Sequence, residues 1–194
     1  MPRIQHALSL LVVLVSLAPL RASATVALHL DAATQAARSD LVVLARVRGQ
    51  EVLRGKDGLP YTHTTLIVER SLKGTRKAGE AVVVRQMGGT LDGKTLTVPG
   101  DARFEVGERV VVFLADREPG TGVLFLTALG QSKLHVAGRA RDGDLILQRQ
   151  LGGLLLLDRA HRPVQPDPRT TLRTLRQVIA AGIEQRSTGK GVRP

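Results

Sequence analysis

A glycine-rich stretch carries the sharpest chemical signature in the 194-residue chain. Residues 88–95, Gly-Gly-Thr-Leu-Asp-Gly-Lys-Thr, match the phosphate-binding loop of nucleotide hydrolases. That loop needs a helix to begin at its Lys-Thr end, so that backbone N–H groups and the helix dipole converge on the phosphates. Residues 96–100 instead read Leu-Thr-Val-Pro-Gly, an extended arm that Pro99 ends. The stretch therefore predicts a β-hairpin about Asp92-Gly93, and not a nucleotide site.

Other side chains capable of chemistry are scattered along the chain. The histidines beyond the leader lack the spacing of zinc ligands: His29, His63, His135 and His161. The serines stand in no nucleophile-elbow pattern: Ser39, Ser71, Ser132 and Ser187. Asp142 and Asp144 flank a glycine, which is typical of a turn. The sequence predicts no catalytic, cofactor-binding or metal-ligating residue and no cofactor, although an enzyme built from distant residues stays open.

Residues 1–24 have the features of a secretory signal peptide. A polar start with Arg3 precedes a 14-residue apolar run at 7–20, and residues 22–24, Ala-Ser-Ala, supply the small-residue cleavage pattern. A membrane span needs about 20 apolar residues, so the run is short for an uncleaved anchor. We therefore expect cleavage after Ala24, a mature chain from Thr25 without a membrane anchor, and a periplasmic or secreted location.

Composition limits the remaining possibilities. The chain has no cysteine, so disulfides, thiolate metal sites and a cysteine nucleophile are excluded, and stability must come from packing and hydrogen bonding. The formal net charge is +11, and loss of Arg3 and Arg21 with the leader would leave +9. Such a charge can attract acidic polymers. Because the basic residues are spread along the sequence, and the excess of arginine is typical of a GC-rich genome, a polyanion is an alternative partner.

The elements that must position any site are mostly short strands. The β-branched run inside residues 104–114 predicts a central strand. Further strands are expected at residues 41–48, 61–72, 80–87, 94–98, 123–129, 133–136, 138–141, 145–150 and 154–157. Many short strands with turn signals between them predict a closed barrel, with a β-sandwich as the alternative.

One expected helix lies on each side of these strands. Asp31 is the predicted N-cap of a short alanine-rich helix that ends at residues 39–40. After a proline-rich connection, Thr170 or Thr171 caps a last helix with an apolar stripe. We expect this helix to dock on the barrel; a membrane-surface helix is the alternative, but the stripe lacks aromatic anchors. The expected organisation is a barrel domain at 25–160, a connection and helix at 161–186, and a flexible tail at 187–194.

Several short segments together resemble one family. They are the helix ending at 39–40, the strand at 41–47, residues 61–62 leading into 68–74, Gly88-Gly89, and residues 104–108 before 110–114. This pattern, over about residues 30 to 140, resembles a group of uncharacterised exported bacterial proteins. Their barrel is similar to the OB-type fold of netrin-like and tissue-inhibitor-of-metalloproteinase domains. The resemblance implies a five-stranded Greek-key barrel that binds another protein. It does not imply protease inhibition, which in that family needs an N-terminal cysteine.

Together these features predict a mostly β protein, an OB-like Greek-key β-barrel with an N-terminal and a C-terminal helix. We expect an exported, non-catalytic binding or structural module of the cell envelope, whose partner is another envelope or secreted protein. A polyanion-binding basic protein and an envelope enzyme of unknown chemistry are the alternatives. Specific nucleic-acid binding is not expected, because the chain has one tyrosine, three phenylalanines and no tryptophan for base stacking.

Overall fold

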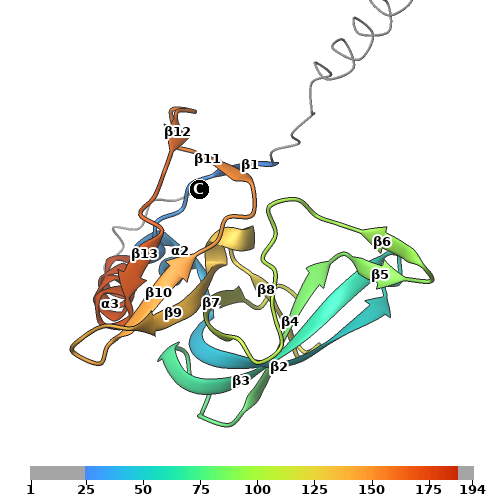
Figure 1. Ribbon diagram of the computed structural model, residues 1–194, viewed down its shortest axis with the longest axis horizontal. Helices are drawn as coiled ribbons and strands as arrows, with labels where there is room; N and C mark the ends of the chain where they lie inside the picture. Colours follow the sequence, from blue (N-terminus) through green and yellow to red (C-terminus); the bar gives the residue numbers. More distant parts are fainter. Residues whose placement is uncertain (1–24, 188–194) are drawn as a thin grey trace, which may run out of the picture.

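The computed structural model describes residues 25–187, so the expected signal peptide and residues 188–194 of the expected tail lie outside it (Figure 1). Its strands are β1 (Thr25–Leu28), β2 (Leu41–Arg54), β3 (Pro60–Lys73), β4 (Ala81–Met87), β5 (Gly89–Leu91), β6 (Lys94–Leu96), β7 (Arg109–Ala115), β8 (Val123–Leu126), β9 (Lys133–Arg139), β10 (Leu145–Arg149), β11 (Leu154–Leu157), β12 (Pro163–Val164) and β13 (Arg169–Thr171). Its helices are α2 (Ala32–Arg38), the short 3-10 helix η1 (Leu129–Ser132) and α3 (Leu172–Ser187). The prediction of a mostly β protein with a helix near each end is confirmed.

One eight-stranded sheet forms the body of the protein, in the order β13-β10-β9-β7-β2-β3-β4-β8. Its neighbours are antiparallel except β4 and β8, which run parallel. β8 also pairs with β7, through Leu114 with Leu126 and Ala115 with Phe125. The sheet does not close into a barrel as a whole, because β9, β10 and β13 continue from β7 to an edge of their own (Figure 1).

Strand β7 and the first half of β2 lie at the centre of this sheet and are buried on both faces. One core lies on the concave side of the curled sheet and includes alternate residues of both strands: Leu41, Val43, Ala45 and Val47 with Val110, Val112 and Leu114. The other core lies beneath the helices and takes the intervening residues: Val42 and Leu44 with Val111 and Phe113. The alternation is the period of two that a strand imposes. The predicted central strand is confirmed, but it begins at Arg109 and not at residue 104, because Glu108 N–H closes a turn on the Glu105 carbonyl at 3.0 Å.

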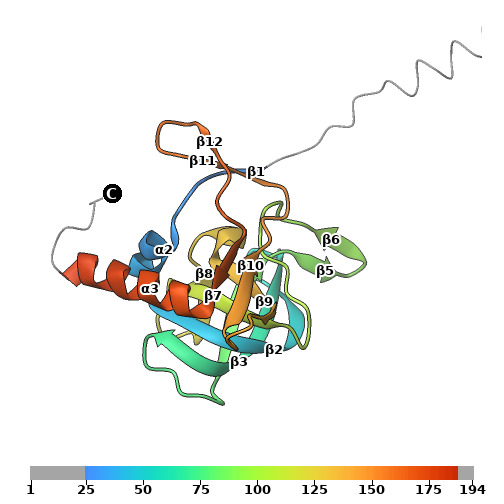
Figure 2. The same ribbon diagram turned by 60° about the vertical axis from the view of Figure 1, so that its left-hand side comes forward.

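Both helices cover the same face of the sheet (Figure 2). Asp31 caps α2 as predicted, since its Oδ1 accepts from Thr34 N–H at 2.7 Å. The α3 stripe packs inward, with Leu172, Leu175 and Ile179 buried in the core between this helix and the sheet. The two helices touch closely, because a Cβ added at Gly182 would lie 2.5 Å from the Ala33 carbonyl oxygen. Among residues 25–187, no helix is long and apolar enough to cross a membrane.

A small three-stranded sheet, β1-β11-β12, was only partly predicted. β11 was expected, whereas β1, which runs parallel to β11, and the two-residue β12 were not. Residues 133–136 and 138–141, expected as two strands, form the single strand β9 with an irregular register at its pairing with β10. Short strands of this kind carry too few residues for their alternation to be read from sequence.

A buried polar network joins β1, α2 and η1. Gln131, only 2% exposed, donates to the Leu28 carbonyl and accepts from Leu30 N–H, both at 3.0 Å. Gln35 in α2 donates to the Leu30 carbonyl at 2.7 Å and accepts from the Ser132 hydroxyl at 3.2 Å. His29 N–H between β1 and α2 still donates to the Leu157 carbonyl of β11 at 2.7 Å, whereas the backbone groups of Leu30 are satisfied by the two glutamine side chains.

Replacement of Gln131 by leucine tests this network. Gln131→Leu leaves the Leu28 carbonyl and the Leu30 N–H without partners, so we expect the free energy of unfolding in urea to fall by about 2 kcal/mol. The matched change Gln177→Leu, on the exposed side of α3, should cost less than about 0.5 kcal/mol. Equal effects of the two changes would contradict the structural role of Gln131.

Candidate functional site

The stretch that matches a phosphate-binding loop folds as a hairpin. β5 pairs antiparallel with β6, and Asp92 and Gly93 make the turn with φ of 50° and 73°. The hydroxyls of Thr90 and Thr95 face each other at 2.8 Å across the hairpin. Lys94 begins a strand and not a helix, so the predicted hairpin is confirmed and backbone N–H groups do not converge on a phosphate there.

A groove runs between this hairpin and the ends of β2, β3 and β4; we call it the hairpin groove. It encloses about 450 Å³ and is lined by Gln50, Glu51, Val52, Thr62, residues 86–89, residues 95–98 and residues 101–104. Gly88 and Gly89, with φ of 112° and 129°, turn the chain from β4 into its wall. A Cβ at Gly89 would lie 2.9 Å from the Val52 side chain, so glycine is required for this close approach.

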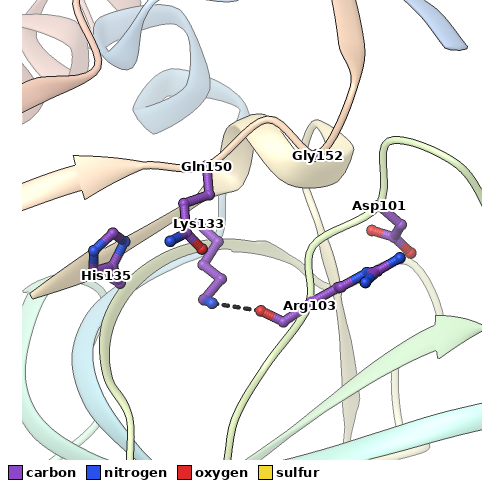
Figure 3. Close-up of a pocket in the computed structure, with 6 residues that line it drawn as sticks. All are labelled: Asp101, Arg103, Lys133, His135, Gln150 and Gly152. Atoms are coloured by element: carbon purple, nitrogen blue, oxygen red, sulfur yellow. Dashed lines mark hydrogen bonds between the residues drawn. The ribbon is translucent and has the colours of Figure 1, made fainter. Parts of the chain in front are cut away.

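A smaller cavity of about 70 Å³ adjoins the groove, because Asp101 and Arg103 line both. We call it the inner cavity, and Figure 3 shows the residues that line it: Asp101, Arg103, Lys133, His135, Gln150 and Gly152. Lys133 and His135 come from β9, and Gln150 follows β10. Asp101 and Arg103 lie on the opposite side, on the segment that precedes β7 (Figure 3).

A buried lysine holds that segment in place. Only 7% of the Lys133 side chain is exposed, and its Nζ lies 2.8 Å from Glu108 Oε2. Nζ also donates to the Arg103 carbonyl and lies 5.1 Å from the centre of the Phe104 ring. The same Glu108 oxygen accepts from Glu105 N–H at 3.2 Å. Lys133 therefore connects β9 both to the turn at residues 105–108 and to the preceding segment, which lines the groove.

The segment also contains a partly buried carboxyl group. Burial raises the pKa of Asp101 above its usual value of 3.8, although Ala102 N–H and the Gln86 side chain favour the ionised form. Gln86 of β4 donates to the Ala102 carbonyl at 2.8 Å, which ties the segment to the groove floor. Nδ1 of His135 is buried and has no hydrogen-bond partner among the described residues. These groups can accept and donate hydrogen bonds, and the lining of the inner cavity contains no hydroxyl or thiol nucleophile.

The other side chains capable of chemistry do not gather at one site. Asp142 Oδ1 accepts from Asp144 N–H at 3.1 Å, which confirms that this pair makes a turn. Of the histidines, only His135 lines the inner cavity. Within residues 25–187, no group of three or more His, Asp or Glu side chains could hold a metal ion. The sequence offers one signal for the site, a lysine at residue 133 that begins a predicted strand, and that signal was missed.

Comparison of the chain with protein-family models and with curated protein sequences finds no match. Its function is therefore inferred from its own residues and geometry.

The buried ion pair leads to a stability prediction. Glu108→Gln leaves the Lys133 ammonium buried without a counter-charge, so we expect the free energy of unfolding to fall by about 3 kcal/mol. The double variant Glu108→Gln/Lys133→Met has no buried charge and should be more stable than Glu108→Gln alone. Urea unfolding measures both. A single variant within about 0.5 kcal/mol of the parent would mean that the pair is not buried as described.

The Asp101 carboxyl leads to a pH prediction. Because its pKa is raised on folding, the folded state holds this proton more tightly than the unfolded chain, and the resulting stability is lost as pH rises through the folded pKa. Asp101→Asn removes the ionisation and can still accept from Ala102 N–H. We expect the stability of the variant relative to the parent to increase from about pH 3 to about pH 6. A constant or decreasing difference would contradict the burial of this carboxylate.

Proposed function

We propose that this protein is an exported, non-catalytic binding module of the cell envelope, built on an OB-type barrel. The pairing order β7-β2-β3-β4-β8, the parallel β4–β8 pair and the return of β8 to β7 support that topology. In this reading β2, β3, β4, β7 and β8 are the five Greek-key strands, and the remaining strands and helices are additions. OB folds bind their ligands on the face of the second and third strands, which here are β3 and β4.

The hairpin groove is the observation that carries the proposal. It reaches that region of the fold, because Thr62 of β3 and Gln86 and Met87 of β4 line it. Both apolar and polar side chains line it, and Met87 is 45% exposed. A groove of about 450 Å³ accommodates several side chains of an extended segment. The partner proposed is therefore another envelope or secreted protein, which inserts an extended segment.

The hairpin supplies backbone groups as well as side chains. β5 and β6 form a two-stranded sheet of their own, so each strand has one edge that pairs with no other strand of the described chain. An extended partner segment can add to such an edge by main-chain hydrogen bonds, while the groove provides pockets for its side chains. The inner cavity behind the groove then offers charged and polar groups for one polar side chain of the partner.

A pair of matched variants tests the proposal. Met87 lines the groove, whereas Leu53 is similarly exposed, at 43%, but does not line it. We expect Met87→Arg to lose the envelope protein that the parent retains in a pull-down, by at least about tenfold, and Leu53→Arg to retain it. The retained protein is identified with the parent first and then measured with each variant. Equal retention by both variants would contradict binding in the hairpin groove.

A further inference from the structure

Six arginines that are far apart in the sequence come together on one surface. They belong to β2, β3, β7, β9 and α3, and we call them the arginine surface: Arg46, Arg70, Arg109, Arg139, Arg173 and Arg176. The turn between β9 and β10 lies beside the start of α3 (Figure 2). Asp144 of this turn accepts a hydrogen bond from the backbone N–H of Arg173 at 3.1 Å. Arginines that are widely separated along the chain therefore meet on this surface.

Two adjoining hollows lie on this surface. One, of about 300 Å³, is lined by Arg70, Arg173 and Arg176 with the 142–144 turn and Leu172. The other, of about 260 Å³, is lined by Arg70, Arg109 and Arg139 with Leu44, Glu69, Leu145, Leu172 and residues 143–144. Arg70 lines both hollows, so it stands between two places where an anionic group could bind.

The carboxylates nearby neutralise only part of this charge. Glu69 accepts three hydrogen bonds from the Arg109 side chain and lies 3.5 Å from Arg46. Asp142 pairs with Arg173 at 3.1 Å. Asp144 accepts from the N–H groups of Arg173 and Leu145. These three carboxylates face six guanidinium groups.

Three of the arginines have no carboxylate partner. Arg139 donates only to the Gly143 carbonyl, and the Arg70 and Arg176 side chains have no hydrogen bond or ion pair among the described residues. The side chains most free to bind a ligand are thus the ones that line the hollows. Arg70 and Arg176 also come from different elements, β3 and α3, on the first hollow.

We propose that the arginine surface binds a linear polymer with neighbouring phosphate groups. A guanidinium group presents a planar fork of donors that suits phosphate oxygens. A phosphate has more acceptor oxygens than a carboxylate, so it can accept from forks on two sides, as Arg70 and Arg176 would supply. Because the two hollows share Arg70, a ligand with successive phosphates gains over a single phosphate ion. This site is separate from the hairpin groove and does not depend on it.

The test measures binding of inorganic polyphosphate to the purified protein over a series of salt concentrations. The parent should bind polyphosphate more tightly than orthophosphate, and the affinity should fall steeply with salt. Arg70→Glu/Arg176→Glu should weaken binding by at least about tenfold and reduce the salt slope by about two. The control Lys56→Glu/Arg159→Glu has the same net charge at exposed positions outside both hollows, and should stay within about twofold of the parent. Arg70→Lys/Arg176→Lys keeps the charge but loses the fork, and should show an intermediate loss.

Four outcomes would overturn the proposal. Equal weakening by the two charge-reversal pairs would show that net charge alone attracts the polymer. Equal affinity for polyglutamate of matched length would refute the preference for phosphate, and binding only to vesicles of anionic phospholipid would refute a free polymer. Failure of the parent to bind polyphosphate at low salt would refute the site. Circular dichroism checks that each variant is folded, and Met87→Arg, which tests the groove, should bind polyphosphate as the parent does.

Discussion

The fold depends on one constraint, which is that β2 and β7 pair in the middle of a sheet whose two faces are both covered. Their registers place Val43 beside Val112 and Leu44 beside Val111, so alternate residues of each strand enter opposite cores. Each strand must therefore be apolar on both faces where they pair. That requirement explains the continuous apolar runs in these strands, because a strand with only one covered face would alternate with polar residues.

The same two strands lead outward to the surfaces proposed to bind. β2 is 14 residues long, and its first half lies between the two cores while Val52, near its far end, lines the hairpin groove. Beyond Ala45 and Val110 the pair continues into Arg46 and Arg109, directly opposite each other, at the edge of the arginine surface. Both surfaces are thus attached to the best-packed part of the molecule, which fixes their side chains more firmly than a loop could.

Local features of this fold were predictable from the sequence, and long-range ones were not. The cap at Asp31, the turn at Asp92-Gly93 and the core run after Arg109 each depend on neighbouring residues, and each was confirmed. Lys133 and Glu108 pair across 25 positions, and the arginines of the arginine surface span residues 46–176, so neither grouping has a sequence pattern. The inner cavity was missed for the same reason, because its carboxyl, lysine and histidine meet only when β9 pairs with β7.

The most direct test of the account is hydrogen–deuterium exchange of the protein alone and with the envelope protein that it retains. The central claim is that an extended partner segment lies in the hairpin groove, against β5, β6 and residues 97–104. We therefore predict that bound partner slows exchange of amides in those segments and leaves the slow amides of β2 and β7 unchanged. Slowed exchange confined to other parts of the chain, such as β1, β11 and β12, would contradict the account.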